Sequence, residues 1–224
     1  MSNTKLKVIF AIIIVSAVAG VAWPFFANLN FNTLPVKASQ WHMGKGSQYA
    51  PEMIYSVNFN NTKFTADMKF LPQQGDNQQL LIQIKPDNSD KVISQTVNIG
   101  LVYDFPNVSP DAKPYFDKLD QSVFSMRDYA TDDKYLAVGA EWGDIYIGAN
   151  HEKLTVTNFG KMSFGFGSTN AYLLSYREGV NQNQYWIVDN LPLPVKETEY
   201  DFDGNLLYSY ELVSLNAPST PGLT

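Results

Sequence analysis

The sequence contains no cysteine. This absence excludes disulfide bonds, thiolate nucleophiles, lipid attachment through an N-terminal cysteine, and cysteine-based zinc or iron–sulfur sites. The fold must therefore be stabilised by its core alone. Secreted eukaryotic domains of this size usually carry disulfides, so the absence also favours a prokaryotic cell envelope for a chain that carries an export signal.

Charged residues are scarce, and their balance is acidic. They make up 17% of the 224 residues, and the formal net charge is −6. A phosphate backbone would be repelled by such a surface, so nucleic acid is not an expected partner. Hydrophobic residues reach 45%, which is enough for a folded core, and the length suits one sizeable domain plus an anchor.

Motifs for common catalytic chemistries are missing as well. The only histidines are His42 and His151, which do not form a zinc motif. There is no Gly-x-Ser-x-Gly motif and no complete glycine-rich phosphate or dinucleotide loop. We therefore name no catalytic residue and expect no cofactor, apart from the calcium site considered below. The sequence favours a non-enzymatic protein without deciding the point.

The N-terminal segment is long and apolar. Lys5 and Lys7 precede an uncharged run at residues 8–27. A helix of this length matches a hydrocarbon core of about 30 Å, and the preceding lysines orient it with the C-terminal domain outside. We therefore predict a cytoplasmic stub at residues 1–7 and a single transmembrane anchor at residues 8–27 that binds the cell membrane.

The same segment also fits a cleaved signal peptide. The apolar stretch is short before Trp23, and small residues lie just before it. Cleavage near Gly20 or Trp23 would then give a secreted product. This alternative stays open beside the anchor.

Beyond the anchor, the chain divides into three parts. Residues 28–50 show no sustained periodicity and contain turn formers, so we expect a linker or stalk. Residues 51–215 are expected to form the β-rich extracytoplasmic domain. Residues 216–224 contain prolines and small polar residues, and we expect a disordered tail.

Strict alternation of apolar and polar residues predicts strands in the domain. Two alternating runs flank Asn60 and Asn61, and two later runs flank Asp203 and Gly204, both typical of hairpin turns. Other expected strands are Gln79–Lys85, Lys91–Tyr103, Tyr135–Trp142, Asp144–Gly148, Lys153–Phe159, Lys161–Gly167, Ala171–Tyr176 and Gln184–Val188. Helical spacing of apolar residues predicts one helix at about 110–128. The expected fold class is all-β, a mainly antiparallel sandwich or barrel with one helix.

Acidic and aromatic residues gather in two places that suggest carbohydrate recognition. Two carboxylates beside aromatic faces are typical of sugar-binding and glycosidase sites. Glu141 and Asp144 would need a bulge at Gly143 to reach the same side of a strand. The candidate residues are Glu141, Trp142, Asp144, Tyr146, Tyr185 and Trp186.

A calcium site is a weaker candidate. Asp201, Asp203 and Asn205 place oxygen ligands at alternate positions, as calcium loops do, but the later glycine and glutamate of the helix–loop–helix pattern are missing. A hairpin turn explains the same residues without metal. Asn60 and Asn107 begin glycosylation sequons, which suit a location outside the cytoplasm.

The functional hypothesis follows from these observations. An anchored domain without a catalytic motif, rich in tyrosine and asparagine, is typical of a binding surface. We expect a non-enzymatic binding or structural component, or an accessory subunit, that contacts other proteins of the cell envelope. The alternative is a carbohydrate-binding or glycan-hydrolysing envelope protein.

Overall fold

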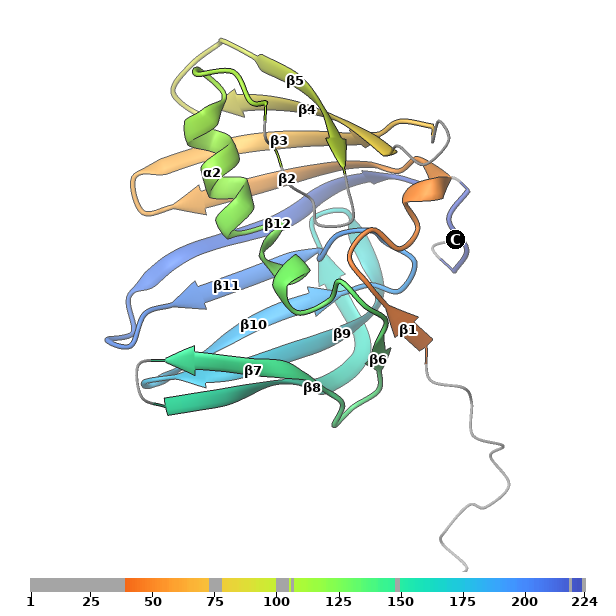
Figure 1. Ribbon diagram of the computed structural model, residues 1–224, viewed down its shortest axis with the longest axis vertical. Helices are drawn as coiled ribbons and strands as arrows, with labels where there is room; N and C mark the ends of the chain where they lie inside the picture. The colour runs from red at the N-terminus through yellow and green to blue at the C-terminus, as the bar shows by residue number, and fades with distance from the viewer. Residues whose placement is uncertain are drawn as a thin grey trace, which may run out of the picture. The chain divides into compact units, whose positions relative to one another are not determined.

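The computed structural model describes only part of the chain. The described residues are 39–72, 78–99, 105, 107–147, 150–217 and 219–222 (Figure 1). No helix among them is long and apolar enough to cross a membrane. The stub, the predicted anchor at residues 8–27 and the first part of the predicted linker lie outside these residues.

Ten antiparallel strands form one large sheet within the described residues, in the order β5-β4-β3-β2-β12-β11-β10-β9-β8-β7. The strands are β2 (Glu52–Phe59), β3 (Thr62–Phe70), β4 (Gln78–Pro86), β5 (Ile93–Ile99), β7 (Glu141–Ile147), β8 (Asn150–Phe164), β9 (Gly167–Glu178), β10 (Asn181–Ile187), β11 (Lys196–Tyr200) and β12 (Leu206–Asn216). A second, two-stranded sheet joins β1 (Ser39–Trp41) to β6 (Lys134–Leu136).

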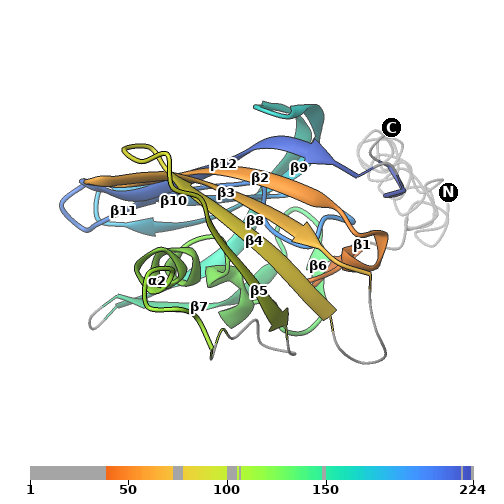
Figure 2. The same cartoon turned by 90° about the horizontal axis from the view of Figure 1, so that it is seen from above.

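The large sheet is strongly curved, and its concave face holds the core (Figures 1 and 2). The α-helix α2 (Lys113–Gln121) and the 3-10 helix η2 (Ser125–Asp128) lie on that face. Alternate residues of each strand point toward them, which explains the alternating burial along β2, β3 and β4. The expected all-β class with one helix is confirmed for the described residues.

Both predicted hairpins are confirmed. Strands β2 and β3 pair across Asn60 and Asn61, with Phe59 opposite Thr62. Strands β11 and β12 pair across the turn that contains Gly204, which has a positive φ of 87°. These turns were predictable because residues that tolerate positive φ separate two alternating runs.

Three strand predictions need correction. The expected strand Tyr135–Trp142 is broken by a turn with Gly139 at φ 91°, so that its two halves belong to β6 and β7. The expected strands Lys153–Phe159 and Lys161–Gly167 are one strand, β8, because Gly160 continues in extended pairing with Ala171. A glycine in the sequence therefore does not by itself end a strand.

The predicted helix at about 110–128 is interrupted. Its α-helical part ends at Gln121, and Ser122 donates a hydrogen bond from its hydroxyl to Lys118 O at 2.7 Å. The chain then turns and continues as η2. Apolar residues at the predicted spacing are nevertheless buried, because both pieces pack on the concave face.

Residues 39–50 belong to the folded unit, so this part of the predicted linker is wrong. Trp41 is 0% exposed, stacks on Trp142 with ring centroids 5.7 Å apart, and donates from Nε1 to Leu191 O at 2.7 Å. The turn-rich sequence around Trp41 concealed this role. The short 3-10 helix η1 (Ser47–Tyr49) follows it.

The predicted tail also contains ordered contacts. Asn216 is the last residue of β12, Thr220 is buried, and Asn190 donates from Nδ2 to Pro221 O at 3.3 Å. The prediction of a disordered tail is therefore wrong for residues 216, 217 and 219–222. Prolines and small residues are here compatible with packing because the segment is short and lies against the connection between β10 and β11.

Candidate functional site

The candidate site is a cluster of two buried glutamates and four tyrosines on the concave face. Strand β11 alternates strictly, and Glu197 and Glu199 point inward while Lys196, Thr198 and Tyr200 lie on the opposite face. Glu197 is 0% exposed and Glu199 is 9% exposed. Glutamate is rarely buried without a charged partner, so this placement requires an explanation.

Strand register surrounds these carboxylates with phenol rings. Glu197 pairs with Tyr185 on β10 and with Tyr210 on β12, and Glu199 pairs with Tyr208 on β12. Paired residues in neighbouring strands share a face, so these side chains converge. We call Tyr176, Tyr185, Glu197, Glu199, Tyr208 and Tyr210 the glutamate–tyrosine cluster.

The hydrogen bonds in the cluster leave several buried oxygen atoms unsatisfied. Tyr208 donates to Glu197 Oε1 at 2.5 Å, and Tyr176 donates to Glu199 Oε1. Within the part of the chain that the structure describes, Glu197 Oε2, Glu199 Oε2 and the Tyr210 hydroxyl have no partner at full hydrogen-bonding distance. Such atoms cost free energy because their interactions with water are lost and not replaced. The Tyr210 and Tyr185 hydroxyls nevertheless lie close enough to Glu197 to lower its pKa, against the larger effect of burial.

No ion pair offsets the charge of the two carboxylates within the described residues. None of the ion pairs between described residues includes Glu197 or Glu199. Burial, reinforced by the charge of Glu199, raises the pKa of Glu197 well above its ordinary value. Burial is also the main cause that raises the pKa of Glu199 to about 7.

The tyrosines remain protonated through the neutral range. Burial and the nearby carboxylates raise the pKa of Tyr176, Tyr185, Tyr208 and Tyr210 above the ordinary value of 10. They therefore act as hydrogen-bond donors and aromatic walls. The cluster can bind protons reversibly near neutral pH and can accept hydrogen bonds from a cation.

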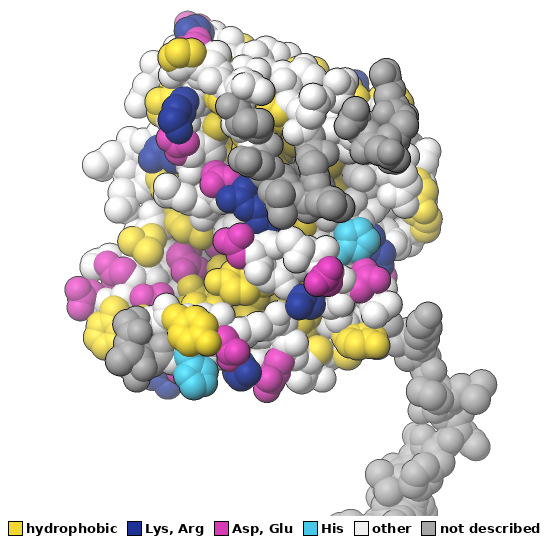
Figure 3. All heavy atoms as spheres, viewed as in Figure 1, with side chains coloured by type: hydrophobic (Ala, Val, Ile, Leu, Met, Phe, Trp, Pro, Cys, Tyr) yellow, Lys and Arg dark blue, Asp and Glu magenta, His cyan; other side chains and the backbone are white. Residues whose placement is uncertain are grey.

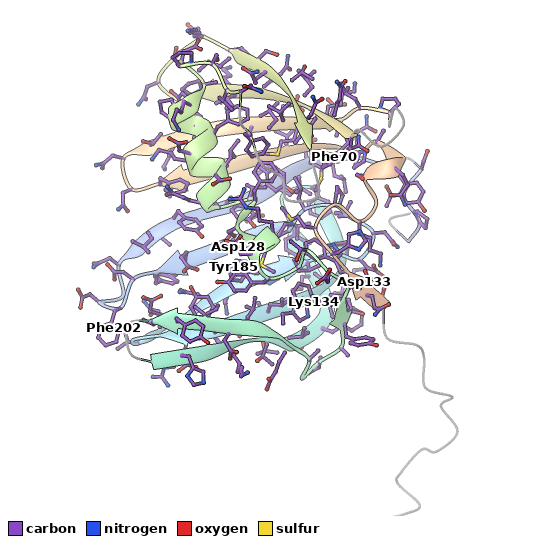
Figure 4. All side chains as sticks on the ribbon, in the orientation of Figure 1. Phe70, Asp128, Asp133, Lys134, Tyr185 and Phe202 are labelled. Atoms are coloured by element: carbon purple, nitrogen blue, oxygen red, sulfur yellow. The ribbon has the colours of Figure 1, made fainter. Side chains whose placement is uncertain are left out.

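Exposed apolar side chains lie at the end of the sheet that carries the β9–β10 and β11–β12 turns, which we call the hairpin end (Figure 1). Tyr146 on β7 is 78% exposed and Phe202 in the β11–β12 turn is 64% exposed. Phe59 stacks on Tyr208 of the cluster with ring centroids 4.9 Å apart. Figure 3 shows hydrophobic and acidic side chains together between α2 and β7. Figure 4 shows Tyr185 next to Asp128 of η2 in this view. Phe202 lies at the hairpin end of the sheet.

The residues selected for carbohydrate recognition do not form one platform. Trp142 is buried and its ring is covered by Trp41, so it is a core residue. Tyr185 is buried in the glutamate–tyrosine cluster. Trp186 is half-buried on the opposite face of β10, where the Lys196 Nζ lies 5.6 Å from its ring centroid. The structure therefore does not bring these three aromatic side chains together.

Glu141 and Asp144 do lie on one side of β7. The register shifts between Glu141 and Gly143, and this bulge brings both carboxylates to Lys153 Nζ, at 3.6 Å and 2.8 Å. Hydrogen bonding to Lys153 lowers the pKa of Asp144. The pair is thus an exposed ion-pair group, with Tyr146 two residues further along β7.

The calcium candidates instead stabilise a turn. Asp201 accepts hydrogen bonds from the Asn205 backbone N–H at 2.8 Å and from Asn205 Nδ2 at 3.0 Å. Asp203 is exposed in the same turn. No group of three or more acidic, histidine or cysteine residues that could hold a metal ion occurs among the described residues. The arrangement fits the hairpin explanation.

The glycosylation sequons and one surface pocket are not part of the glutamate–tyrosine cluster. The glycosylation candidates Asn60 and Asn107 are both exposed in turns, and glycosylation itself remains a prediction. A pocket of about 230 Å³ opens between β8, β9, the β10–β11 connection and the C-terminal segment, with Phe159, Tyr172 and Asp189 in its lining. Asp189 is already bonded to Lys45 and Ser39 there.

Sequence reasoning missed Glu197 and Glu199. The stretch Lys-Glu-Thr-Glu-Tyr has the composition of an exposed strand. A signal was nevertheless present, because Tyr208, Tyr210 and Leu212 alternate on β12. The hairpin register across Gly204 places the two glutamates on the same face as these apolar residues.

Comparison with known proteins shows distant resemblance in structure only. No family model and no curated protein matches the sequence. The Pseudomonas aeruginosa MucA/MucB complex contains a chain with 12% identity and a TM-score of 0.44, with 81% of this chain and 56% of that chain covered. A crystal structure of MucB gives 12% identity, 81% and 57% coverage, and a TM-score of 0.41.

A Bacteroides fragilis protein with a YmcC-like fold gives 8% identity and a TM-score of 0.34, with 80% of this chain and 99% of that chain covered. The chain thus spans about half the length of the MucB chains that it matches.

Proposed function

We propose that this protein is a membrane-anchored, extracytoplasmic binding domain that acts as a non-enzymatic accessory or structural component of the cell envelope. The observation that carries its location is the apolar run at residues 8–27 behind Lys5 and Lys7. The lack of cysteine suits a bacterial envelope domain that folds without disulfides.

The binding role is supported by the exposed apolar side chains at the hairpin end of the sheet. Tyr146, Val180 and Phe202 are each more than half exposed. An alanine Cβ at Gly179 would lie 2.1 Å from Phe202 O, so Val180 and Phe202 belong to adjoining turns. Apolar groups gathered at one end of a domain are typical of protein-contact surfaces.

Photo-crosslinking in intact membranes tests this function. A benzoylphenylalanine at position 202 of the full-length protein should capture a defined envelope protein. The same residue at position 138 provides the control, because Val138 is also exposed but lies in the β6–β7 turn. Capture from neither position, together with a monomeric full-length protein in mild detergent, would contradict the proposal.

A further inference from the structure

The glutamate–tyrosine cluster carries an electrostatic cost that the described residues do not offset. A buried carboxylate without a cation loses its hydration and gains little in return. Glutamine at the same positions would avoid most of this cost while keeping the size of the side chain. The two glutamates thus weaken the folded protein near neutral pH unless a positive group joins them.

The atoms without a full hydrogen bond lie on one face of the sheet. Glu197 Oε2, Glu199 Oε2 and the Tyr210 hydroxyl are all buried and lack a partner at full hydrogen-bonding distance. They belong to adjacent strands, and their side chains lie on the same concave face. Two carboxylate oxygens on one face match a group with several N–H donors, such as an ammonium or a guanidinium.

The walls of the cluster favour a cation for a second reason. Phenol rings attract a positive charge through their electron-rich faces, and the ring centroids of Tyr176 and Tyr185 lie 6.5 Å apart with 27° between the ring planes. Tyr208 and Phe59 stack on each other and are both half-buried, so the cluster adjoins partly exposed side chains. Carboxylates combined with aromatic rings recognise amines better than neutral ligands.

We propose that Glu197 and Glu199 form the receptor for a lysine or arginine side chain presented by the protein partner of this domain. This inference rests on the proposed function and names the chemistry by which the partner is held. The incoming cation would donate to the unsatisfied carboxylate oxygens. Any proton held by the carboxylates would leave to solvent as the cation binds, so charge stays balanced.

A divalent metal fits the same space less well. Only two carboxylates converge, and no described group of three or more acidic, histidine or cysteine side chains could complete a coordination shell. A free polyamine has the same chemistry as a lysine side chain, and the experiment must therefore separate these two sources.

Calorimetric titration of the full-length protein in detergent at pH 8 tests the inference. The probes are the capped peptide acetyl-Ser-Lys-Ser-Lys-Ser-amide, the same peptide with norleucine in place of lysine, and spermidine. The lysine peptide should bind and the norleucine peptide should not. Glu199→Gln should weaken binding by at least about thirtyfold, because a buried charge pair loses one partner.

Two controls keep the result interpretable. Glu152→Gln removes a carboxylate from the exposed part of β8 and should leave the affinity unchanged. The melting temperature of Glu199→Gln should be equal to or above that of the parent protein, so that weaker binding cannot be attributed to unfolding.

Each remaining outcome contradicts the inference in a distinct way. Equal binding of both peptides, or unchanged affinity in Glu199→Gln, would show that the carboxylate does not recognise the cation. Tighter binding of spermidine than of the peptide would assign the cluster to free amines. If crosslinking at position 202 persists unchanged in Glu199→Gln, the proposed function stands and this inference falls.

Discussion

Glu197 and Glu199 occupy the inward-facing positions of β11, where apolar side chains are the usual choice. Their inward orientation follows from the register of β11 against β10 and β12, which leaves no alternative once the hairpin turn is fixed. The residue identities themselves indicated an exposed strand, since the two glutamates alternate with a lysine, a threonine and a tyrosine. Only the cross-strand partners reveal the burial, and these depend on tertiary pairing.

The raised pKa of Glu199 predicts an unusual dependence of stability on pH. Its pKa is about 7 in the folded protein against an ordinary value of 4.5. Between these values the folded state binds more protons than the unfolded state, so stability is highest below pH 4.5 with respect to this group. The contribution of Glu199 to the free energy of unfolding is lost as pH rises toward 7, with a slope of at most about 1.4 kcal/mol per pH unit.

Urea unfolding of the full-length protein in detergent at pH 5 and pH 7.5 checks this prediction. The parent protein should be more stable at pH 5, and Glu199→Gln should reduce the difference. Glu197 acts in the same direction, because its pKa is also raised. The titratable groups that face the pair are Tyr129, Tyr176, Glu178, Tyr185, Tyr208 and Tyr210. Equal stability changes in both proteins would refute the assignment to Glu199.

At the scale of elements, close backbone contacts join segments that are distant in sequence. Gly46 precedes η1 with φ +89°, and an added Cβ would lie 2.0 Å from Asn190 O. The contact fixes residues 39–50 against the β10–β11 connection. The sequence could not indicate it, because a glycine in a turn-rich stretch has the same appearance whether its surroundings are open or packed.

Alanine substitutions at two glycines measure this contact. Gly139 has nearly the same backbone angle, φ +91°, but an added Cβ there meets nothing within 4 Å. Gly139→Ala should therefore cost only the left-handed conformation, about 1–2 kcal/mol. Gly46→Ala should cost more, about 3 kcal/mol or above, because the backbone must also move. Similar losses in chemical denaturation for the two variants would show that residues 39–50 are not firmly attached.

The hairpins, by contrast, were predictable because their signals are local. Asn60, Asn61 and Gly204 lie directly between the strands that they connect. The division between β6 and β7 was not predictable from propensity, since Tyr135 and Trp142 both favour strands. Trp142 instead turns inward to stack on Trp41, a contact between segments about a hundred residues apart.

At the scale of the whole molecule, the location proposed here depends on the fate of residues 8–27. A retained anchor requires detergent for extraction and keeps Met1–Lys7 attached. Intact mass spectrometry of the protein recovered from membranes should give nearly the full chain of 25.2 kDa. A product that begins near Gly20 or Trp23 would instead establish cleavage and a secreted domain.

The order of strands in the large sheet has a consequence for how the chain reaches its folded state. Strands β2 and β12 are neighbours, so Val57 pairs with Tyr210 across most of the domain sequence. Among the described strands, β5, β4, β3 and β2 are hydrogen-bonded to the other six only through the pairing of β2 with β12. Such high contact order implies slow folding, and the two parts of the sheet stay unjoined until Leu206–Asn216 has been synthesised. For the export that we propose, this delay would keep the chain unfolded enough to pass through a translocation channel.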